Sequence, residues 1–368
     1  MPIQLISFVF VIHSVMYKSL PIGPAGPSTA RGSRRLEKVR STKTSVDKPA
    51  WTGSDSLPSK LVNALIASPL FPLLKIGARQ QMQMTAEKND IPWRRTVAQL
   101  EAAQPRLQQL YDAVVDETIR YPSYYTKPFH AYDEGNLNWL ASYEVEPATY
   151  AMAMRIWPDE PGLSPFAAQE RLRSTVYDRI KEYIGEIRVE NILDVGCSTG
   201  VSTRYLARSF PDSKVLGLDL SPHFLSVAML RQEPDYRPIF EENMEVQEKI
   251  SYKHANFEDS GLGDDEFDVI MLQFIAHELP ASPTVKIAQE AMRLLRPGGI
   301  LALVDNDPQS PVIQGLPAPI FSLMKSTEPH SDEYYAFSQE SNLKNAGFVD
   351  VCSSAVDPRH RLILARKR

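Results

Sequence analysis

The chain has 368 residues, of which 43% are hydrophobic and 23% charged, with 17 Gly, 29 Pro and 2 Cys. This length suffices for one large domain or two ordinary ones, and the composition excludes a collagen, a coiled coil and a wholly disordered protein. Cys197 and Cys352 are too few for a disulfide framework or a four-thiolate zinc site, so we expect a reducing compartment and no metal. With a net charge of −5, the protein has no electrostatic reason to bind nucleic acid.

The first 50 residues differ in charge from the rest of the chain. They hold eight basic and two acidic residues, a net charge of +6, so the remainder carries −11. An apolar run, Ile3–Ile12, is followed by a Ser, Thr, Pro and Arg-rich stretch without an acidic residue before Glu37. This order is typical of targeting sequences, so residues 1–50 are predicted to be a disordered targeting segment. We expect a plastid (chloroplast) destination, with the mitochondrion and a cytoplasmic protein with a basic tail as alternatives.

Residues 51–163 are predicted to form a helical and aromatic N-terminal cap. Apolar residues recur at helical spacing up to about Ile119, and one helix is expected through Val97–Val114. Residues 121–163 are predicted to be irregular; their aromatic side chains could cover a ligand or simply pack the cap against the next domain. Residues 61–84 are apolar and Met-rich, so they could touch a membrane surface, with a buried cap as the alternative.

The pattern changes at residue 164, which predicts a second domain over 164–368, with its core at 190–310 and C-terminal strands in 311–368. A helix is expected from Ser164 to about Ile184, since Ser-Pro is a cap followed by proline at the first helical position. Strands and helices then alternate, which predicts an α/β fold, a parallel sheet with helices on both faces. The strands are expected at 191–195, 214–218, 268–272, 300–304, 349–353 and 361–365, and the helices at 202–209, from 221, at 283–295 and at 342–346.

A glycine turn, Asp194-Val-Gly196-Cys197-Ser198-Thr199-Gly200, lies between the first strand and its helix. Glycines let the backbone turn sharply and approach a ligand closely, and the following helix offers its positive N-terminus. A dinucleotide site requires G-x-G-x-x-G. Here the middle position is Ser198 and Val201 takes the place of a third glycine, which argues against a nicotinamide or flavin dinucleotide.

The same turn also fits the G-x-S-x-G elbow of serine hydrolases, with Ser198 as nucleophile. Asp305 and His360 follow in the chain order that such a triad requires. However, that fold places several strands before the elbow, and we expect none before Asn191. An α/β serine hydrolase remains an alternative function.

A third kind of site is indicated by motifs that follow one another in order. The turn resembles the D-x-G-x-S-x-G signature loop of class I S-adenosylmethionine-dependent methyltransferases. Asp219 closes the second strand 19 positions beyond the last glycine of the turn, where a carboxylate can accept from both ribose hydroxyls. The segment Ala255–Glu258 follows a third short strand, Asp264–Ile270 resembles the "DxxFDxV" start of the fourth, and Leu295–Gly299 matches the L-[KR]-P-G-G turn before the fifth.

This resemblance covers about residues 165–310 and is nearest to the type 11, ubiquinone/menaquinone C-methyltransferase-like group. Glu328–Tyr335, Gly347-Phe348, Pro358–Arg361 and the stretch Tyr132–Tyr150 resemble a plant and cyanobacterial subgroup whose substrates are mostly unassigned. The resemblance implies a Rossmann-like sheet and S-adenosylmethionine as cofactor. It also implies a small organic methyl acceptor, lipophilic or aromatic, and leaves the acceptor's identity and the oligomeric state open.

The resemblance assigns cofactor contacts residue by residue. The turn would approach the methionine part with its backbone N–H groups near the carboxylate, while Asp194 orders the loop or meets the amino group. Asp219 is expected to face the crevice and bind ribose, with the adenine beside Asn256 and Phe257. The complete set of expected cofactor-binding residues is Asp194, Gly196, Cys197, Ser198, Gly200, Asp219, Leu220, Asn256, Phe257 and Gln273.

The acceptor is expected at the carboxyl ends of the fourth and fifth strands. His277 is the candidate general base because the ordinary pKa of histidine lies near working pH, with a structural hydrogen bond as the alternative role. Glu278, beside it, is expected to be solvated or to cap a helix. Because no acceptor motif is decisive, a non-catalytic cofactor-binding protein of the same fold is a further alternative.

Overall fold

The computed structural model describes residues 71–128, 132–239, 249–317 and 328–368, together with Pro49, Lys60, Ala64 and Ser68. Apart from Pro49, the predicted targeting segment 1–50 therefore lies outside the described residues. The same holds for most of 61–70, the first part of the apolar segment. Among the described residues, no helix is both long and apolar enough to cross a membrane.

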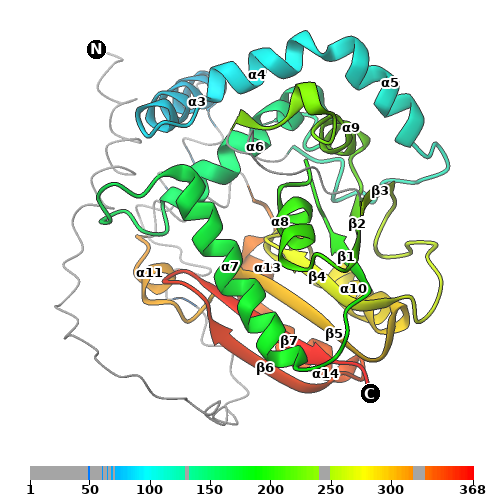
Figure 1. Cartoon of the computed structure of the whole chain (residues 1–368). Coiled ribbons are helices and arrows are strands. Elements are labelled where there is room, and N and C mark those ends of the chain that lie inside the picture. The colour runs from blue at the N-terminus through cyan, green and yellow to red at the C-terminus, as the bar shows by residue number, and fades with distance from the viewer. Residues whose placement is uncertain are drawn as a thin grey trace.

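A seven-stranded sheet forms the centre of the molecule, in the order β3-β2-β1-β4-β5-β7-β6 (Figure 1). Strands β1 to β5 are parallel, whereas β7 runs antiparallel to both β5 and β6. The predicted α/β fold is confirmed, although the sheet is mixed and not wholly parallel. The strands are β1 (Asn191–Val195), β2 (Lys214–Asp219), β3 (Ile250–His254), β4 (Phe267–Gln273), β5 (Leu295–Asn306), β6 (Val349–Ala355) and β7 (His360–Arg366).

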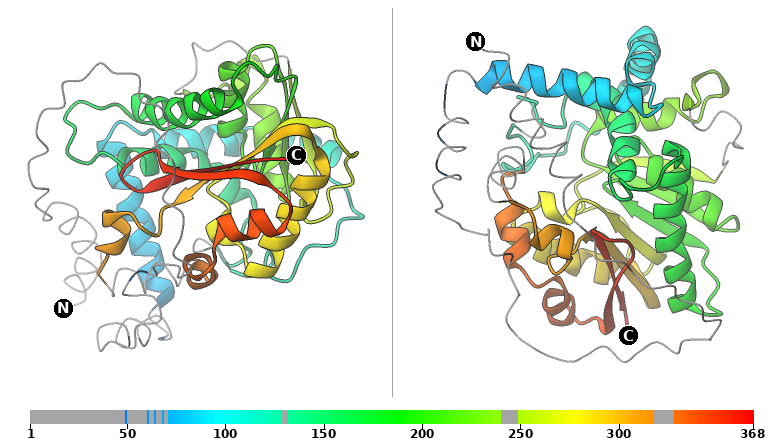
Figure 2. Two further views of the ribbon diagram at one scale, coloured as in Figure 1. Left: turned by 90° about the horizontal axis from the view of Figure 1, so that it is seen from below. Right: turned by 90° about the vertical axis from the view of Figure 1, so that its left-hand side faces the viewer.

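Successive residues of the central strands enter two different hydrophobic cores, because side chains alternate between the faces of a sheet. In β1, Leu193 and Val195 belong to one core and Ile192 to the other. The first core is covered by α10 (Ala281–Leu294) and α14 (Gln339–Asn345), the second by α7 (Pro165–Ile184) and α8 (Val201–Ser209). The left view of Figure 2 shows this layering, with α7 in green on one side of the red strands and the yellow and orange helices on the other.

A Ser-Pro pair starts α7 and also the helix that follows β2. Ser164 Oγ accepts from Ala167 N ahead of α7, as the sequence predicted, and Ser221 does the same for Phe224 N ahead of α9 (Pro222–Leu230). A proline at the first helical position loses nothing, because its missing N–H would have no partner in the helix. The shorter helical elements are η1 (Pro234–Tyr236), η3 (Ala276–Glu278), α11 (Pro311–Gln314) and α13 (Ser331–Ala336).

The cap runs along the top of Figure 1 as α3 (Phe71–Lys88), α4 (Trp93–Ala102) and α5 (Gln104–Val114), with α6 (Trp139–Met154) and α9 beneath. The single helix expected through Val97–Val114 is in fact two helices, which meet at Ala103. Pro105 explains the break, since proline lacks the N–H for a continuous helix and its ring clashes with the preceding turn.

Helix α6 contradicts the expectation that residues 121–163 are irregular. Asn138 caps it by accepting from Ala141 N, while Pro147 lies inside it. Buried residues occur all around the helix, and they include the carboxylates Glu144 and Glu146. A helix buried on every side shows no apolar stripe, so its 3.6-residue period is invisible in the sequence.

Candidate cofactor and acceptor site

The site lies where the strand order reverses. β1 has β2 on one side and β4 on the other, so a crevice forms at the carboxyl ends of β1 and β4, the usual place for ligands in such sheets. The glycine turn follows β1 at this point, Asp219 ends β2, and η3 follows β4. The structure therefore brings the predicted cofactor and acceptor residues to one edge of the sheet.

The glycine turn contains three residues in the left-handed region, Gly196 (φ 66°), Ser198 (φ 51°) and Gly200 (φ 76°). A Cβ at Gly196 would lie 2.8 Å from the side chain of Ile275, and one at Gly200 would meet the Tyr252 hydroxyl. Glycine is thus required at both positions by conformation and by packing. Ser198 holds the same backbone conformation at a cost of about 1–2 kcal/mol, which is typical of strain kept at functional sites.

The backbone N–H groups of this turn are largely engaged within the protein. Gly196 N and Cys197 N both donate to Leu218 O, at 2.8 and 3.1 Å, and Ser198 N donates to Asp219 Oδ2 at 2.7 Å. The expectation that these amides face the methionine carboxylate is therefore wrong for these three residues. They tie the turn to the end of β2 instead.

Asp219 is buried, with 6% of its surface exposed, and does not stand open in the crevice as expected. Its two oxygens accept from Ser221 N at 2.8 Å and Ser198 N at 2.7 Å, and burial raises the pKa of Asp219 to about 6. The two carboxylate oxygens have about four acceptor positions, and backbone groups of Ser221, Ser198 and Leu220 bind three of them, so acceptor capacity remains for a ribose hydroxyl. Asp219 thus shapes the turn and keeps the acceptor capacity that ribose requires.

Asp194 and Gln273 meet in a buried network under the turn. Asp194 Oδ2 accepts from the hydroxyls of Ser202 and Thr203, both at 2.7 Å, and burial raises the pKa of the Asp194 carboxyl. Gln273 donates to Asp194 Oδ1 at 3.4 Å and accepts from the buried Arg173. Because Asp194 is fully buried, it orders the loop, which is one of the two roles expected for it.

The side chains of Cys197 and Phe257 point into the protein. A Cβ added to Gly217 would lie 2.9 Å from Cys197 Sγ, and burial raises the pKa of the Cys197 thiol well above its usual range. Phe257 is 5% exposed and belongs to the main core. The Phe257 ring therefore does not bracket an adenine as expected, and only backbone groups of these two residues remain as candidates.

On the adenine side, the cap reaches the strand ends directly. Asn256 Oδ1 accepts from Glu258 N at 3.0 Å, and Glu258 Oε1 accepts from Tyr124 OH at 2.8 Å. The chain between α5 and α6 thus covers the Ala255–Glu258 segment. Leu220 contributes its carbonyl oxygen, which lies 3.1 Å from His254 Nε2.

Two further tyrosines of the same connection lie over the crevice. Tyr121 and Tyr125 are stacked, with ring centroids 6.2 Å apart and planes 9° apart. Burial, together with the nearby charges of Asp219 and Glu278, raises the pKa of Tyr125 well above its ordinary value. Tyr125 is therefore close to both Asp219 and Glu278, which agrees with the ligand-covering role that was one of the two expected for the aromatic residues of 121–163.

On the acceptor side, His277 is paired with Asp305 at the end of β5. His277 Nδ1 lies 2.8 Å from Asp305 Oδ1, and His277 N donates to Oδ2 at 3.1 Å. Burial lowers the pKa of His277, but the attraction of the Asp305 carboxylate outweighs it and raises the pKa to about 10. The expectation that His277 titrates near neutrality is therefore wrong, because the Asp305 carboxylate favours the imidazolium form.

The surroundings of His277 are acidic and aromatic. Burial and the neighbouring carboxylates Glu328, Asp305 and Asp219 raise the pKa of Glu278 to about 8, although the His277 charge opposes them. Glu278 is half-buried, so it keeps part of the solvation that the sequence predicted, and it ends the short helix η3. The ring of Tyr334 lies edge-on to His277, with centroids 6.3 Å apart.

The serine hydrolase alternative is contradicted by the same contacts. Asp305 binds His277, while His360 Nδ1 lies 2.8 Å from Asp357 Oδ2. Ser198 Oγ is buried and has no hydrogen-bond partner among the described residues. The Ser198, Asp305 and His360 triad is therefore not assembled.

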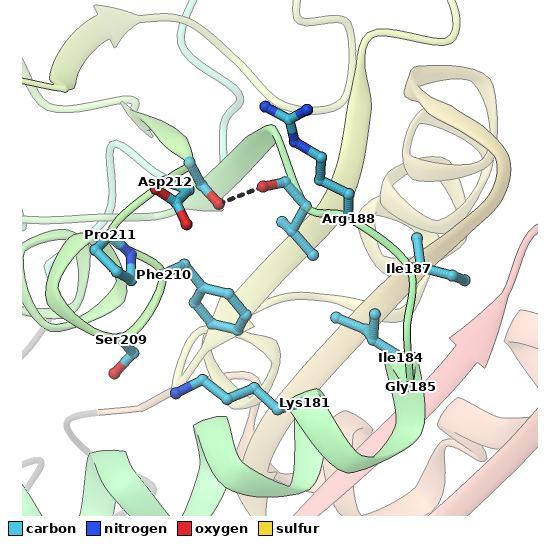
Figure 3. Close-up of a pocket in the computed structure, with 11 residues that line it drawn as sticks. Lys181, Ile184, Gly185, Ile187, Arg188, Ser209, Phe210, Pro211 and Asp212 are labelled. Atoms are coloured by element: carbon cyan, nitrogen blue, oxygen red, sulfur yellow. Dashed lines mark hydrogen bonds between the residues drawn. The ribbon is translucent and has the colours of Figure 1, made fainter.

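A separate surface hollow, with a volume of about 400 Å³, lies between the end of α7 and the residues after α8 (Figure 3). Ser213 Oγ donates to Val189 O at 2.7 Å at its edge. The hollow is lined by Lys181, Ile184, Gly185, Ile187–Val189 and Ser209–Ser213. These segments precede β1 and β2, so the hollow is at the amino ends of the strands. None of the predicted site residues lines it.

Residues 193–303 match the family model "Methyltransferase domain". Methyltransferase GfsG from Streptomyces halstedii is 30% identical over 203 residues, which cover 53% of this chain and 66% of that protein. Erythromycin 3''-O-methyltransferase from Saccharopolyspora erythraea is 28% identical over 192 residues, covering 50% of this chain and 59% of that protein. A crystal structure of a SAM-dependent methyltransferase from Aquifex aeolicus is 19% identical, with a TM-score of 0.40, and covers 59% of this chain and 98% of that one.

By this match, residues 193–303 form a methyltransferase domain. The matches to the two curated relatives span less than two thirds of their lengths. This assignment agrees with the motifs in the sequence and with the strand order of the sheet.

Proposed function

We propose that this protein transfers the methyl group of S-adenosylmethionine to a small organic acceptor. The observation that carries the proposal is the pairing of Asp219 with the strained turn that follows β1, through the 2.7 Å bond from Ser198 N. The buried Ser198 Oγ, which lacks a hydrogen-bond partner among the described residues, is a polar atom available to the cofactor. The residues present therefore fit S-adenosylmethionine.

In this proposal the turn holds the methionine part, Asp219 accepts from the ribose hydroxyls, and Asn256 meets the adenine edge. When bound, the cofactor supplies a methyl group that its sulfonium already makes electrophilic. The protein has to orient the acceptor toward this methyl group and remove a proton where the acceptor carries one.

His277 is proposed to face the acceptor. Its Nδ1 is held by Asp305, so Nε2 is the ring nitrogen that an acceptor can reach. The neutral form takes the acceptor's proton, and the Asp305 carboxylate stabilises the imidazolium that results. Because the pKa of His277 is about 10, the neutral form becomes more abundant as the pH rises.

A lipophilic or aromatic acceptor is favoured by the aromatic rings near the crevice, Tyr121, Tyr125 and Tyr334. One relative, by its name, methylates an oxygen of erythromycin. The test is to incubate the full chain with methyl-labelled S-adenosylmethionine and a lipid or pigment extract. Label in a small molecule, lost with His277→Gln, supports the proposal; cofactor binding without any transfer would favour the non-catalytic alternative.

A plastid location is proposed for the whole protein, supported by the basic, acid-poor composition of residues 1–50. Fluorescent fusions of the chain with and without these residues test it, because only the longer fusion should enter plastids. Contact of residues 61–84 with a membrane is proposed on their apolar composition and tested by flotation with lipid vesicles.

A further inference from the structure

Two buried carboxylates on α6 have entirely different partners. Glu144 and Glu146 are 1% and 2% exposed. Glu144 is bound within the cap, by Arg79 Nη2 at 2.7 Å, Trp93 Nε1 at 3.1 Å and Tyr132 OH at 2.5 Å. Glu144 therefore binds segments of the cap to one another.

Glu146 binds the methyltransferase domain instead. Its Oε1 accepts from Arg204 Nη2 at 3.0 Å, in the first turn of α8, and its Oε2 accepts from Arg231 Nη2 at 2.5 Å, directly after α9. The side chains of Arg204 and Arg231 are 9% and 0% exposed. One carboxylate thus binds two buried guanidinium groups, and loss of its charge weakens both of these buried ion pairs.

Arg204 also contacts the cofactor turn. Its Nη1 donates to Thr199 O at 3.0 Å. Thr199 is 1% exposed and lies between Ser198 and Gly200, both of which have positive φ angles. The bond from Arg204 therefore fixes the carbonyl between the two residues of the turn that have positive φ.

We propose that Glu146 is a positioning residue for the cofactor turn, acting through Arg204 and Thr199. The inference rests on the proposed function, in which this turn holds S-adenosylmethionine. It makes the helical cap part of the cofactor-binding machinery, although Glu146 itself does not touch the cofactor. Loss of the Glu146 charge lets the Arg204 guanidinium turn away from Thr199 O, and the turn relaxes from its binding shape.

The test is Glu146→Gln in the full chain, titrated calorimetrically with S-adenosylhomocysteine. Glutamine keeps the shape of glutamate but turns an NH₂ group toward one of the two guanidinium groups. We expect the Kd to rise about tenfold, the effect of losing one hydrogen bond to a charged group. Hydrogen exchange should accelerate at the amides of residues 197–204.

Glu144→Gln is the matched control, since it removes an equally buried charge two positions away on the same helix. It should leave the Kd within about twofold of the wild type and leave exchange in the turn unchanged. A general loosening of the cap would instead move both variants alike. Equal effects of the two substitutions on Kd and exchange would overturn the inference while leaving the proposed function intact.

If Glu146→Gln does not fold, Arg204→Lys tests the same inference. A lysine ammonium can reach Glu146 or Thr199 O but does not have the two-armed geometry that binds both. We expect weakened binding of S-adenosylhomocysteine by the folded variant, whereas wild-type affinity would overturn the inference. Absence of binding by the wild-type chain would instead contradict the proposed function.

Discussion

The half-buried His277 pairs with the buried Asp305 at the acceptor end of the crevice, with Nδ1 of the imidazole 2.8 Å from Oδ1 of the carboxylate. Asp305 is completely buried, and its pKa is lowered because the charge and hydrogen bonds of His277 outweigh the effect of burial. The same interaction raises the pKa of His277 to about 10. The charge of each residue therefore depends on the other, although the two lie 28 positions apart in the chain.

Replacing Asp305 with asparagine should lower the pKa of His277 from about 10 toward its ordinary value of 6.5. Asparagine keeps the shape but removes the carboxylate charge that stabilises the imidazolium. An NMR titration of the histidine ring measures this change directly. A His277 pKa that stays near 10 in Asp305→Asn would show that another group holds the proton.

The pair also makes stability depend on pH. A raised histidine pKa stabilises the folded state fully below the unfolded value of 6.5, and this contribution is lost as the pH rises through about 10. Urea unfolding of the wild type should therefore show a free energy of unfolding that declines over this interval. Asp305→Asn should flatten the decline, and an equal decline in both proteins would assign it to other groups.

His277→Gln should reduce methyl transfer by about 10²- to 10⁴-fold if His277 is the general base. The affinity for S-adenosylhomocysteine should barely change, because His277 lies on the acceptor side of the site. The wild-type rate should rise with pH toward about 10, and this rise should disappear in the variant. A variant with full activity and an unchanged pH profile would leave His277 a structural role only.

Asp219→Asn should weaken cofactor binding by about 2–4 kcal/mol, since the ribose hydroxyls lose a charged acceptor. Asparagine is preferred to alanine because it keeps the shape of Asp219 and one of the two oxygens that accept from Ser198 N and Ser221 N, whereas alanine would lose both bonds. Because the pKa of Asp219 is about 6, the cofactor affinity should also depend on pH. Wild-type affinity should fall as the pH drops through about 6, because the carboxylate becomes protonated, and this fall should be absent in Asp219→Asn.

Gly200→Ala should destabilise the fold more than Gly162→Ala does. Both glycines have positive φ, 76° and 83°, so both substitutions carry a conformational cost of about 1–2 kcal/mol. Only at Gly200 does the added methyl group meet a neighbour, the Tyr252 hydroxyl, whereas at Gly162 nothing lies within 4 Å. The free energies of unfolding of the two variants in urea test this, and equal losses would mean that Tyr252 moves aside without cost.

The strands, the glycine turn and Asp219 could be predicted from sequence because each has a local signal. Alternating short apolar runs predict strands, and Gly196 and Gly200 stand where the backbone takes positive φ. The ion pairs of Glu146 could not be predicted, since its partners Arg204 and Arg231 are far along the chain. Nothing in the local pattern says which buried carboxylate will meet which guanidinium.

The charge state of the acceptor site was missed for a related reason. The ordinary pKa of histidine is a property of the residue alone, whereas the pKa of His277 is set by Asp305 on another strand. Likewise, the burial of Asp219 and the inward-facing ring of Phe257 follow from packing, which spacing in the sequence does not reveal.

The most direct test of the account is a calorimetric titration of the full chain with S-adenosylhomocysteine, alongside Asp219→Asn. We predict saturable binding at one site per chain, with the Kd raised at least tenfold by the substitution, as expected for the loss of a charged hydrogen-bond acceptor. Absence of binding at millimolar concentration, or equal binding by the two proteins, would contradict a cofactor site built on the glycine turn and Asp219.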